Sequence, residues 1–499
     1  MDRDERPWAG RDVTVVEREQ GTTGRGRAWR HPRSALTAWL SRPLADFHLL
    51  LAIFGMLTAI GLIMVLSASA PGEVAAGRAA YSVFRNQLMY VGVGAVLFWI
   101  TLRLPLRSIR HSSTMAMLVS VVLLGLVLTP LGTNIWGAQS WFRIGSISFQ
   151  PIEPAKLAMA LWGAHVLVTK RALLNQYRHL LVPVVPVALM VFALVMLQPD
   201  LGGTITLAVV LLSLLWFVGA PMRVFGAIVA AAVGGAVVLA VGASYRLDRV
   251  LAYLDPEEDP LGSGMQSLQA MYALAEGGFF GKGLTNGSAK WRYLPNVHSD
   301  FIFAVIGEEL GFIGCLLVLG LFALLAVVGL RIAARNTDPW IRMIAGTLTV
   351  WLVAQAAINI GYVVRLLPVT GITLPMISSG GTSIVTTMIV FGILASCARH
   401  EPEAVAALRK LGPGRVGGFL RLPAPEAYRP PARRKPGRPS TPPRAPGRRA
   451  AAAPKVEERR VGGRSAPPSE YRRRESRRAT QDRTTRTARP TRRTGRDGR

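Results

Sequence analysis

Ten long apolar runs separated by polar loops fill the sequence between residues 48 and 398. A helix needs roughly 20 apolar residues to cross the hydrocarbon core of a bilayer, and these runs approach or reach that length. Because backbone groups in lipid must form hydrogen bonds within their own segment, we predict a continuous helix for each run. The expected fold is an all-α polytopic membrane protein with about ten transmembrane helices. The predicted spans are 48–67, 88–102, 114–131, 152–168, 180–197, 201–220, 223–242, 301–330, 343–364 and 382–398.

Basic residues mark alternate loops of the predicted bundle. Groups of Arg or Lys precede the first span and follow the second, fourth, sixth, eighth and tenth spans, whereas the intervening short loops carry at most two basic residues each. Cytoplasmic loops of membrane proteins carry an excess of Lys and Arg, so this alternation predicts that both termini are cytoplasmic. No cleavable signal peptide is evident in residues 1–44, and we expect the first span to direct insertion.

Positive charge is concentrated at the C-terminal end of the chain. The formal net charge is +29, and residues 401–499 contain 28 Lys or Arg but only 9 Asp or Glu. This Pro- and Arg-rich segment has few bulky apolar residues, so we predict a disordered cytoplasmic tail over 401–499. Residues 1–44 form a cytoplasmic N-terminal segment, and 45–400 form the membrane domain. The place of the tail beside a membrane favours lipid or protein contacts, and nucleic acid is not expected as a partner.

The longest extracytoplasmic segment, residues 243–300, lies between the seventh and eighth spans. It combines an acidic stretch, a predicted short helix over Gln266–Glu276 and a glycine-rich region over 277–287. A long ordered loop in a compact protein is more often functional than a spacer, although a plain surface connection is the alternative. Its basic residues suit an anionic substrate. The candidate substrate-binding residues of this segment are Arg246, Arg249, Gln266, Gln269 and Lys290.

Ionisable and polar residues inside or beside the predicted spans are costly in lipid and therefore informative. Glu153 and Lys156 open the fourth span at a spacing of i, i+3, so they share one helix face and can neutralise each other. This pair either fixes helix packing or takes part in catalysis. Asp200, two residues after Gln198, either caps the sixth span or belongs to a functional site.

Asp300 stands where the long external segment meets the eighth span. A carboxylate there has water on one side and an apolar wall on the other. Partial desolvation is expected to raise its pKa and make it a usable general base, and a helix N-cap is the alternative role. Glu308 and Glu309 lie about two turns deeper and are interpreted first as structural.

A stretch rich in hydroxyls, glycine and proline, residues 366–383, separates the ninth and tenth spans. Irregular backbone at membrane depth is tolerated only against protein or a wet cavity. Exposed backbone amides in such a stretch can bind a phosphate. No nucleotide-binding glycine motif is evident, so a substrate that carries its own activated phosphate fits better than one that needs ATP. The candidate phosphate-binding residues are Ser378, Ser379, Gly380 and Gly381.

Several of these motifs occur together, and in the same order, in a known family. They are Gln150-Pro-x-Glu153-x-x-Lys156, Gln198-Pro-Asp-Leu-Gly202, Tyr293-Leu-Pro-x-x-His-x-Asp-Phe-Ile-Phe303, Gly307-Glu-Glu-Leu-Gly311 and Ile377-Ser-x-Gly-Gly381. Over residues 45–400 the chain resembles the SEDS family (shape, elongation, division and sporulation). Within that family it is most similar to cell-division members of actinobacterial type, with elongation members as the runner-up.

The resemblance implies a peptidoglycan glycosyltransferase of the bacterial inner membrane that joins lipid II units into glycan strands at the division septum. It implies that Asp300 is the general base for the acceptor 4-hydroxyl, in a reaction that inverts the donor sugar. Arg246, Arg249 and Lys290 would stabilise the leaving pyrophosphate. A divalent cation, Mg²⁺ or Mn²⁺, would help, and no other cofactor is expected. The implied partners are a class B penicillin-binding protein and other divisome proteins.

A few positions depart from the family pattern. Pro368-Val-Thr-Gly371 replaces a common Pro-Thr-Lys-Gly. Ile152 replaces a common Ser, and Pro154 replaces an apolar or small residue. Asn86 stands where a basic residue is usual. Each departure weakens the transfer of a family role at that position, and none affects Asp300.

Two other classes of function remain open at this point. A lipid II flippase would use an intramembrane polar path, which Glu153, Lys156, Glu308 and Glu309 could supply, and it would transport without forming polymer. A non-catalytic scaffold would only hold and activate the transpeptidase, and it predicts that Asp300→Ala leaves function intact. The transferase interpretation predicts instead that Asp300 is essential for the chemistry.

Overall fold

The computed structural model describes residues 42–135, 138–145, 147–171, 181–182, 184–241, 265–288 and 297–428. Arg246, Arg249 and Lys290, which the sequence analysis assigned to the substrate, lie outside these ranges, as does the chain beyond residue 428. The other predicted site residues are described.

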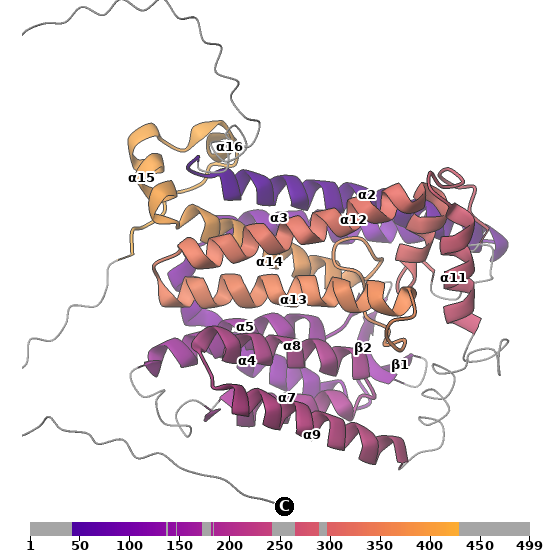
Figure 1. Cartoon of the computed structure of the whole chain (residues 1–499), viewed down its shortest axis with the longest axis horizontal. Helices are drawn as coiled ribbons and strands as arrows, with labels where there is room; N and C mark the ends of the chain where they lie inside the picture. Colours follow the sequence, from indigo (N-terminus) through magenta and orange to yellow (C-terminus); the bar gives the residue numbers. More distant parts are fainter. Residues whose placement is uncertain are drawn as a thin grey trace, which may run out of the picture. The chain divides into compact units, whose positions relative to one another are not determined.

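Each of the ten predicted spans coincides with a helix, and these helices form one bundle (Figure 1). Within the described ranges, seven of them are long and apolar enough to cross a membrane. Of the other three, α7 is apolar over Val184–Met196 and α9 over Met222–Ala231, and α5 carries Glu153 and Lys156 in its first turns. The prediction of a polytopic helical membrane protein is confirmed. The helices are α2 (Ala45–Ala75), α3 (Ser82–Arg103), α4 (Leu106–Leu126), α5 (Ile152–Thr169), α7 (Val184–Met196), α8 (Leu201–Val218), α9 (Met222–Val241), α12 (Ile302–Arg335), α13 (Pro339–Val363) and α14 (Gly381–Arg399).

A small antiparallel sheet that was not predicted from the sequence lies between α4 and α5. Its strands are β1 (Thr133–Ile135), β2 (Ala138–Ile144) and β3 (Ile147–Phe149), in the order β1-β2-β3. β1 and β3 have three residues each, too few for an alternating pattern, and β2 (AQSWFRI) does not alternate strictly between apolar and polar residues. The short helix predicted over Gln266–Glu276 is observed as α11 (Met265–Gly277), which packs on α12.

α12 is interrupted at Gly311, whose φ of 66° and ψ of −164° lie outside the helical region. Residues 278–283 of the external segment occupy the gap. Two amides after the break donate to carbonyls of this segment, and two amides of the segment donate to carbonyls before the break. These hydrogen bonds are Phe312 N to Gly278 O, Ile313 N to Phe279 O, Lys282 N to Glu308 O and Gly283 N to Glu309 O. The segment thereby replaces helical bonds that the break removes.

The stretch between α13 and α14 folds back into the bundle. The backbone of Met376 and Ile377 lies against Gly61, near the middle of α2, so that a Cβ on Gly61 would be 2.9 Å from the Ile377 Cα. Irregular backbone at this depth is therefore covered by protein, as expected. We call residues 364–380 the re-entrant stretch. Four of its apolar side chains are buried: Ile372, Leu374, Met376 and Ile377.

The predicted start of the tail at residue 401 is corrected by the structure. Two helices follow α14, namely α15 (Pro402–Leu411) and α16 (Gly414–Phe419), and the folded chain extends to residue 428. Ala404, Val405 and Leu408 form a buried apolar face on α15. The basic composition of the whole C-terminal segment concealed this short amphipathic helix.

Candidate active site

Asp300 ends a turn, residues 297–300, that leads into α12. Phe301, not Asp300, is the N-cap residue of this helix, so the alternative capping role of Asp300 is not observed. The Asp300 side chain is half-buried. It therefore lies at the boundary between the protein interior and the surface, where the sequence placed it.

Burial raises the pKa of the Asp300 carboxyl to about 6, and a hydrogen bond with Ser299 opposes this shift. In the ranges that the structure describes, no Lys, Arg or His side chain forms an ion pair with Asp300. A carboxyl group with a pKa near neutrality can both hold and release a proton at the working pH. Its environment suits a general base.

Two side chains of α13 fix the backbone around Asp300. Tyr362 Oη lies 2.9 Å from Asp300 O and 2.7 Å from Ile372 O. Asn359 Nδ2 lies 3.0 Å and 2.7 Å from the same two carbonyl oxygens, and 2.6 Å from Tyr362 Oη. The amide group supplies two hydrogens and the hydroxyl one, which is enough for both carbonyls and the tyrosine oxygen. We call this pair of side chains the carbonyl clamp.

The carbonyl clamp was not predicted from the sequence, although its residues have a recognisable spacing. Gln355, Asn359 and Tyr362 follow one another at i, i+4 and i+7 in the apolar run of α13. This spacing places side chains on one helix face, and a polar face in a membrane helix turns toward protein. All three residues are buried.

Ser378 and Ser379 bind the turn that carries Asp300. The Ser378 hydroxyl donates to Ser299 O at 2.6 Å and accepts from Leu374 N at 2.8 Å. The Ser379 amide donates to His298 O at 2.9 Å, and the Ser378 amide donates to Leu374 O at 3.0 Å. The expectation that these two amides are free for a phosphate is therefore wrong. Both residues instead hold residues 298 and 299 against the re-entrant stretch.

Gly380 and Gly381 have a different position. Gly380 is the N-cap residue of α14, and Gly381 is the first residue of that helix. Gly381 packs tightly against the ring of Tyr90, where a Cβ would be 2.6 Å from the ring Cζ. Their amides lie at a helix N-terminus, so phosphate binding by these two residues stays a prediction.

Glu153 and Lys156 form a buried ion pair, with 2.9 Å between Oε1 and Nζ. Lys156 Nζ also lies 3.5 Å from Gln355 Oε1, and Gln355 Nε2 donates to Thr373 O at 3.0 Å. The pair is thus connected through α13 to the re-entrant stretch. This arrangement matches the packing role weighed for it from the sequence.

Asp200 caps α8, since its Oδ1 accepts a hydrogen bond from Gly203 N at 2.6 Å. Its other oxygen, Oδ2, lies 3.3 Å from Gln150 Nε2. Burial raises the pKa of the Asp200 carboxyl, and the Gly203 hydrogen bond opposes the shift. Gln198 is fully buried and donates to Leu124 O at 3.2 Å. Both polar residues of this motif make structural contacts.

The Glu308 carboxylate binds the external segment, and the Glu309 carboxylate binds α2. The buried Glu308 carboxylate accepts from the Ser288 hydroxyl at 2.9 Å and lies 3.5 Å from Lys282 Nζ. Glu309 accepts from the Ser67 hydroxyl of α2 at 2.6 Å. These contacts agree with the structural interpretation of both residues. Gln266 and Gln269 are half-buried on α11, at the same end of the bundle (Figure 1).

Residues 47–403 match the FtsW/RodA/SpoVE family, described as cell cycle proteins. The chain belongs to this family. The resemblance to SEDS proteins inferred from the motifs is therefore confirmed.

Relatives within the family share most of the chain. A "Probable peptidoglycan glycosyltransferase FtsW" of Mycobacterium tuberculosis is 48% identical over 401 residues, covering 80% of this chain and 76% of the relative. Stage V sporulation protein E of Bacillus subtilis is 37% identical over 354 residues, covering 71% of this chain and 97% of the relative. A solved chain, from a study of "Structural coordination of polymerization and crosslinking by a peptidoglycan synthase complex", has a TM-score of 0.59 and 28% identity, covering 71% of this chain and 97% of that one.

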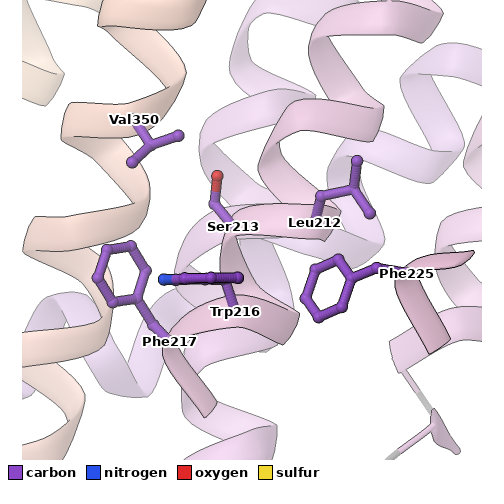
Figure 2. Close-up of a pocket in the computed structure, with 6 residues that line it drawn as sticks. All are labelled: Leu212, Ser213, Trp216, Phe217, Phe225 and Val350. Atoms are coloured by element: carbon purple, nitrogen blue, oxygen red, sulfur yellow. The ribbon is translucent and has the colours of Figure 1, made fainter. Parts of the chain in front are cut away.

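A cavity of about 310 Å³ lies between α8, α9 and α13 of this family member (Figure 2). Val350, on its α13 wall, precedes Asn359 by nine residues, which is about 13 Å along a helix. The only polar side chain in the lining, Ser213, donates to Val209 O within its own helix. The cavity is apolar and separate from Asp300. Its lining residues are Leu212, Ser213, Trp216, Phe217, Phe225 and Val350.

Metal binding by the protein alone finds no support in the described ranges. There, no group of three His, Cys, Asp or Glu side chains is arranged to hold a metal ion. Divalent cations such as Mg²⁺ are often bound mainly by substrate phosphates together with one or two carboxylates. The described residues therefore do not form a resident metal site, and we derive no reaction step through a metal.

Proposed function

We propose that this chain is a peptidoglycan glycosyltransferase of the cell-division type, which polymerises lipid II into glycan strands at the septum. Family relatives named peptidoglycan glycosyltransferase FtsW support the reaction class. The observation that carries the proposal is the environment of Asp300. It is half-buried, unpaired with any cation of the described ranges, and held in place by the carbonyl clamp and Ser378.

Asp300 is the general base in the proposed reaction. Its carboxylate accepts the proton of the acceptor 4-hydroxyl while that oxygen attacks the anomeric carbon of the donor sugar. The bond from this carbon to the phosphate oxygen breaks, and undecaprenyl pyrophosphate leaves with the electron pair. Attack opposite the leaving group inverts the configuration. A positioned base typically contributes about 10²–10⁴-fold to the rate.

The carbonyl clamp supports this chemistry by fixing the position of the base. Its hydrogen bonds reach the main chain of Asp300, so the carboxylate stays free to meet the acceptor. Catalysis is sensitive to small displacements of a reacting group, because a bound reactant must lie within near-contact distance of it. The second carbonyl in the clamp, that of Ile372, ties the base to the re-entrant stretch.

The leaving pyrophosphate requires positive charge. By their place in the external segment, Arg246, Arg249 and Lys290 are proposed to supply it, and Gln266, Gln269, Gly380 and Gly381 are proposed as further lipid II contacts. A Mg²⁺ or Mn²⁺ ion carried by the phosphates of the donor remains part of the proposal, although no step depends on it.

The proposed setting is the bacterial inner membrane, with both termini in the cytoplasm as the basic loops indicate. A class B penicillin-binding protein is the proposed transpeptidase partner, together with other divisome proteins. The solved relative comes from a peptidoglycan synthase complex in which polymerization and crosslinking are coordinated, and this supports such a partner.

The contacts of the intramembrane charges argue against the flippase alternative. Glu153 and Lys156 are paired with each other, Glu308 accepts from Ser288 of the external segment, and Glu309 accepts from Ser67 of α2. Charges used in this way do not supply a continuous polar path through the bundle. A transporter would need residues beyond these four.

The decisive experiment is polymerisation of purified lipid II by the full-length chain together with its transpeptidase. Wild type is compared with Asp300→Asn, which keeps the shape but removes the base. Asp338→Asn is the matched control, because Asp338 caps α13 by accepting from Trp340 N at 2.8 Å and Asn caps a helix equally well. We expect long glycan from wild type and Asp338→Asn, and almost none from Asp300→Asn.

Thermal unfolding of all three proteins confirms that they are folded. Normal polymerisation by Asp300→Asn would show that Asp300 is not the base. Absence of polymer from the wild type would instead contradict the transferase assignment itself.

A further inference from the structure

Residues 401–428 form a folded segment after α14, which we call the C-terminal cap. Leu422 is buried, and Arg399 Nη2 donates to Pro423 O at 2.7 Å. Glu401 Oε2 lies 3.7 Å from Arg335 Nη1 of α12. The C-terminal cap is thus fixed to the end of the bundle at which α12 and α14 finish and α2 begins (Figure 1).

The depth of the C-terminal cap is set by Trp99 of α3. Trp99 Nε1 donates to Leu420 O at 3.1 Å, and the Arg103 guanidinium lies 4.7 Å from the centre of the Trp99 ring. Trp99 is partly exposed on an apolar span, one turn before its end. Tryptophan next to a basic residue at the end of a span is typical of the membrane–water boundary. Leu420 therefore lies at this boundary.

Two apolar side chains of the C-terminal cap face outward. Leu411 is 85% exposed and Phe419 is 86% exposed, more than any other large apolar side chain in the described ranges. Phe419 directly precedes Leu420, so it sits at the depth of the boundary. A fully exposed Phe and Leu are unfavourable in water but are stabilised among lipid acyl chains.

Four exposed basic residues lie within four positions of these apolar residues in the sequence. None of the four forms an ion pair with a carboxylate of the described ranges, although Glu426 and Arg107 pair nearby at 3.1 Å. Exposed cations near a membrane surface attract anionic lipid headgroups, and each contributes independently. The four residues are Arg409, Lys410, Arg415 and Arg421, all exposed.

We propose that the C-terminal cap is a membrane-binding surface for anionic phospholipids. Leu411 and Phe419 insert among the acyl chains, and the four cations bind the headgroup phosphates. The basic loops assign this end of the bundle to the cytoplasm, so the surface engages the cytoplasmic leaflet. The combination of inserted apolar residues with neighbouring cations is that of interfacial membrane-binding helices.

Depth measurements on the full-length chain in nanodiscs test this surface. Single cysteines at Phe419→Cys and Leu411→Cys carry a spin label, because the natural Cys315 and Cys397 are buried. Glu403→Cys, on the same cap and exposed, is the matched control. In nanodiscs that contain phosphatidylglycerol, the labels at 411 and 419 lose collisions with a water-soluble nickel chelate and gain collisions with oxygen. The label at 403 shows the opposite behaviour.

Equal nickel accessibility at 419 and 403 overturns the proposal. A label at 419 that is open to nickel in nanodiscs but protected in native membranes also overturns it, since a protein then covers the surface. Changing the four cations to Gln tests the headgroup contribution. In that variant the 419 label is expected to lose its deeper insertion in phosphatidylglycerol relative to phosphatidylcholine, and insertion that still deepens with phosphatidylglycerol contradicts the role of the cations.

Discussion

Each end of the bundle contains a buried or half-buried aspartate, and the two differ in whether a cation pairs with the side chain. Asp46, at the start of α2, is 2% exposed, and its oxygens lie 3.1 Å from Arg331 Nη2 and 3.6 Å from Arg335 Nη1. The main-chain carbonyl of Asp300 is bound by Asn359 and Tyr362, and that of Ser299 by Ser378. The Asp300 side chain forms no ion pair with a cation among the described residues. A structural carboxylate is neutralised by fixed charges, whereas a carboxylate that must accept a proton is positioned through its backbone and left unpaired.

The largest expected effect separates the two aspartates by activity. Asp300→Asn reduces lipid II polymerisation by about 10²–10⁴-fold, because it removes the base. Asp46→Asn leaves the rate of the folded protein close to wild type, since Asp46 belongs to the opposite end. Rates are measured per folded protein after size-exclusion chromatography. Equal losses in the two variants would remove the distinction.

The second expected effect separates the same residues by stability. Asp46→Asn removes the carboxylate that Arg331 and Arg335 share, while Arg335 keeps Glu401 at 3.7 Å. Loss of one partner of a fully buried ion pair costs about 3–5 kcal/mol. We expect a smaller loss of stability here, because both arginines are partly exposed to solvent and one of them is still paired. Asp300→Asn removes an unpaired carboxylate and does not lower stability. Denaturant or thermal unfolding in detergent checks both values, with wild type as the reference.

The pH dependence of kcat/KM gives a third way to separate Asp300 from Asp46. Because the pKa of Asp300 is about 6, kcat/KM falls roughly tenfold per pH unit below that value as the base becomes protonated. The folded-state pKa lies above the usual value of about 3.9. Asp300 therefore favours folding most below about pH 4, and this contribution is lost as the pH rises through about 6. An acid limb that persists in the residual activity of Asp300→Asn would assign the titration to another group.

A smaller effect is expected from the carbonyl clamp. Tyr362→Phe removes one hydroxyl and costs about 0.5–1.5 kcal/mol of stability. The turn at Asp300 loosens and its carboxyl gains water, so the acid limb of the pH profile moves to lower pH as kcat falls. Tyr362→Leu, which also loses the ring contact with Phe301, is expected to be worse. An unchanged pH profile in Tyr362→Phe would limit Tyr362 to packing.

The smallest effect is expected at an exposed ion pair. Arg107 and Glu426 lie 3.1 Å apart with side chains that are mostly exposed. Surface pairs of this kind contribute about 0–1 kcal/mol. Glu426→Gln is therefore expected to unfold at nearly the wild-type temperature. A large loss would mean that the C-terminal cap depends on this pair more than on its buried residues.

Sequence patterns predicted what depends on local chemistry. The ten spans follow from apolar length, α11 coincides with the short helix predicted over Gln266–Glu276, and Asp300 follows from its place at the edge of a span. The carbonyl clamp joins residue 300 to residues 359, 362 and 372, and such contacts arise only when separate helices pack. The amides of Ser378 and Ser379 were misassigned for the same reason. The Ser379 amide and the Ser378 hydroxyl have partners far away in sequence, in the turn before α12, whereas the Ser378 amide donates to the nearby Leu374 O.

The break at Gly311 divides α12 into two helical halves. Four backbone hydrogen bonds across the joint run through residues 278–283 instead of along the helix. Withdrawing that segment would expose polar groups in an apolar bundle, at about 1–3 kcal/mol for each group left without a partner. These hydrogen bonds therefore join the external segment and both halves of α12 into one rigid unit. Movement of α11 relative to Asp300 requires that these four hydrogen bonds break first.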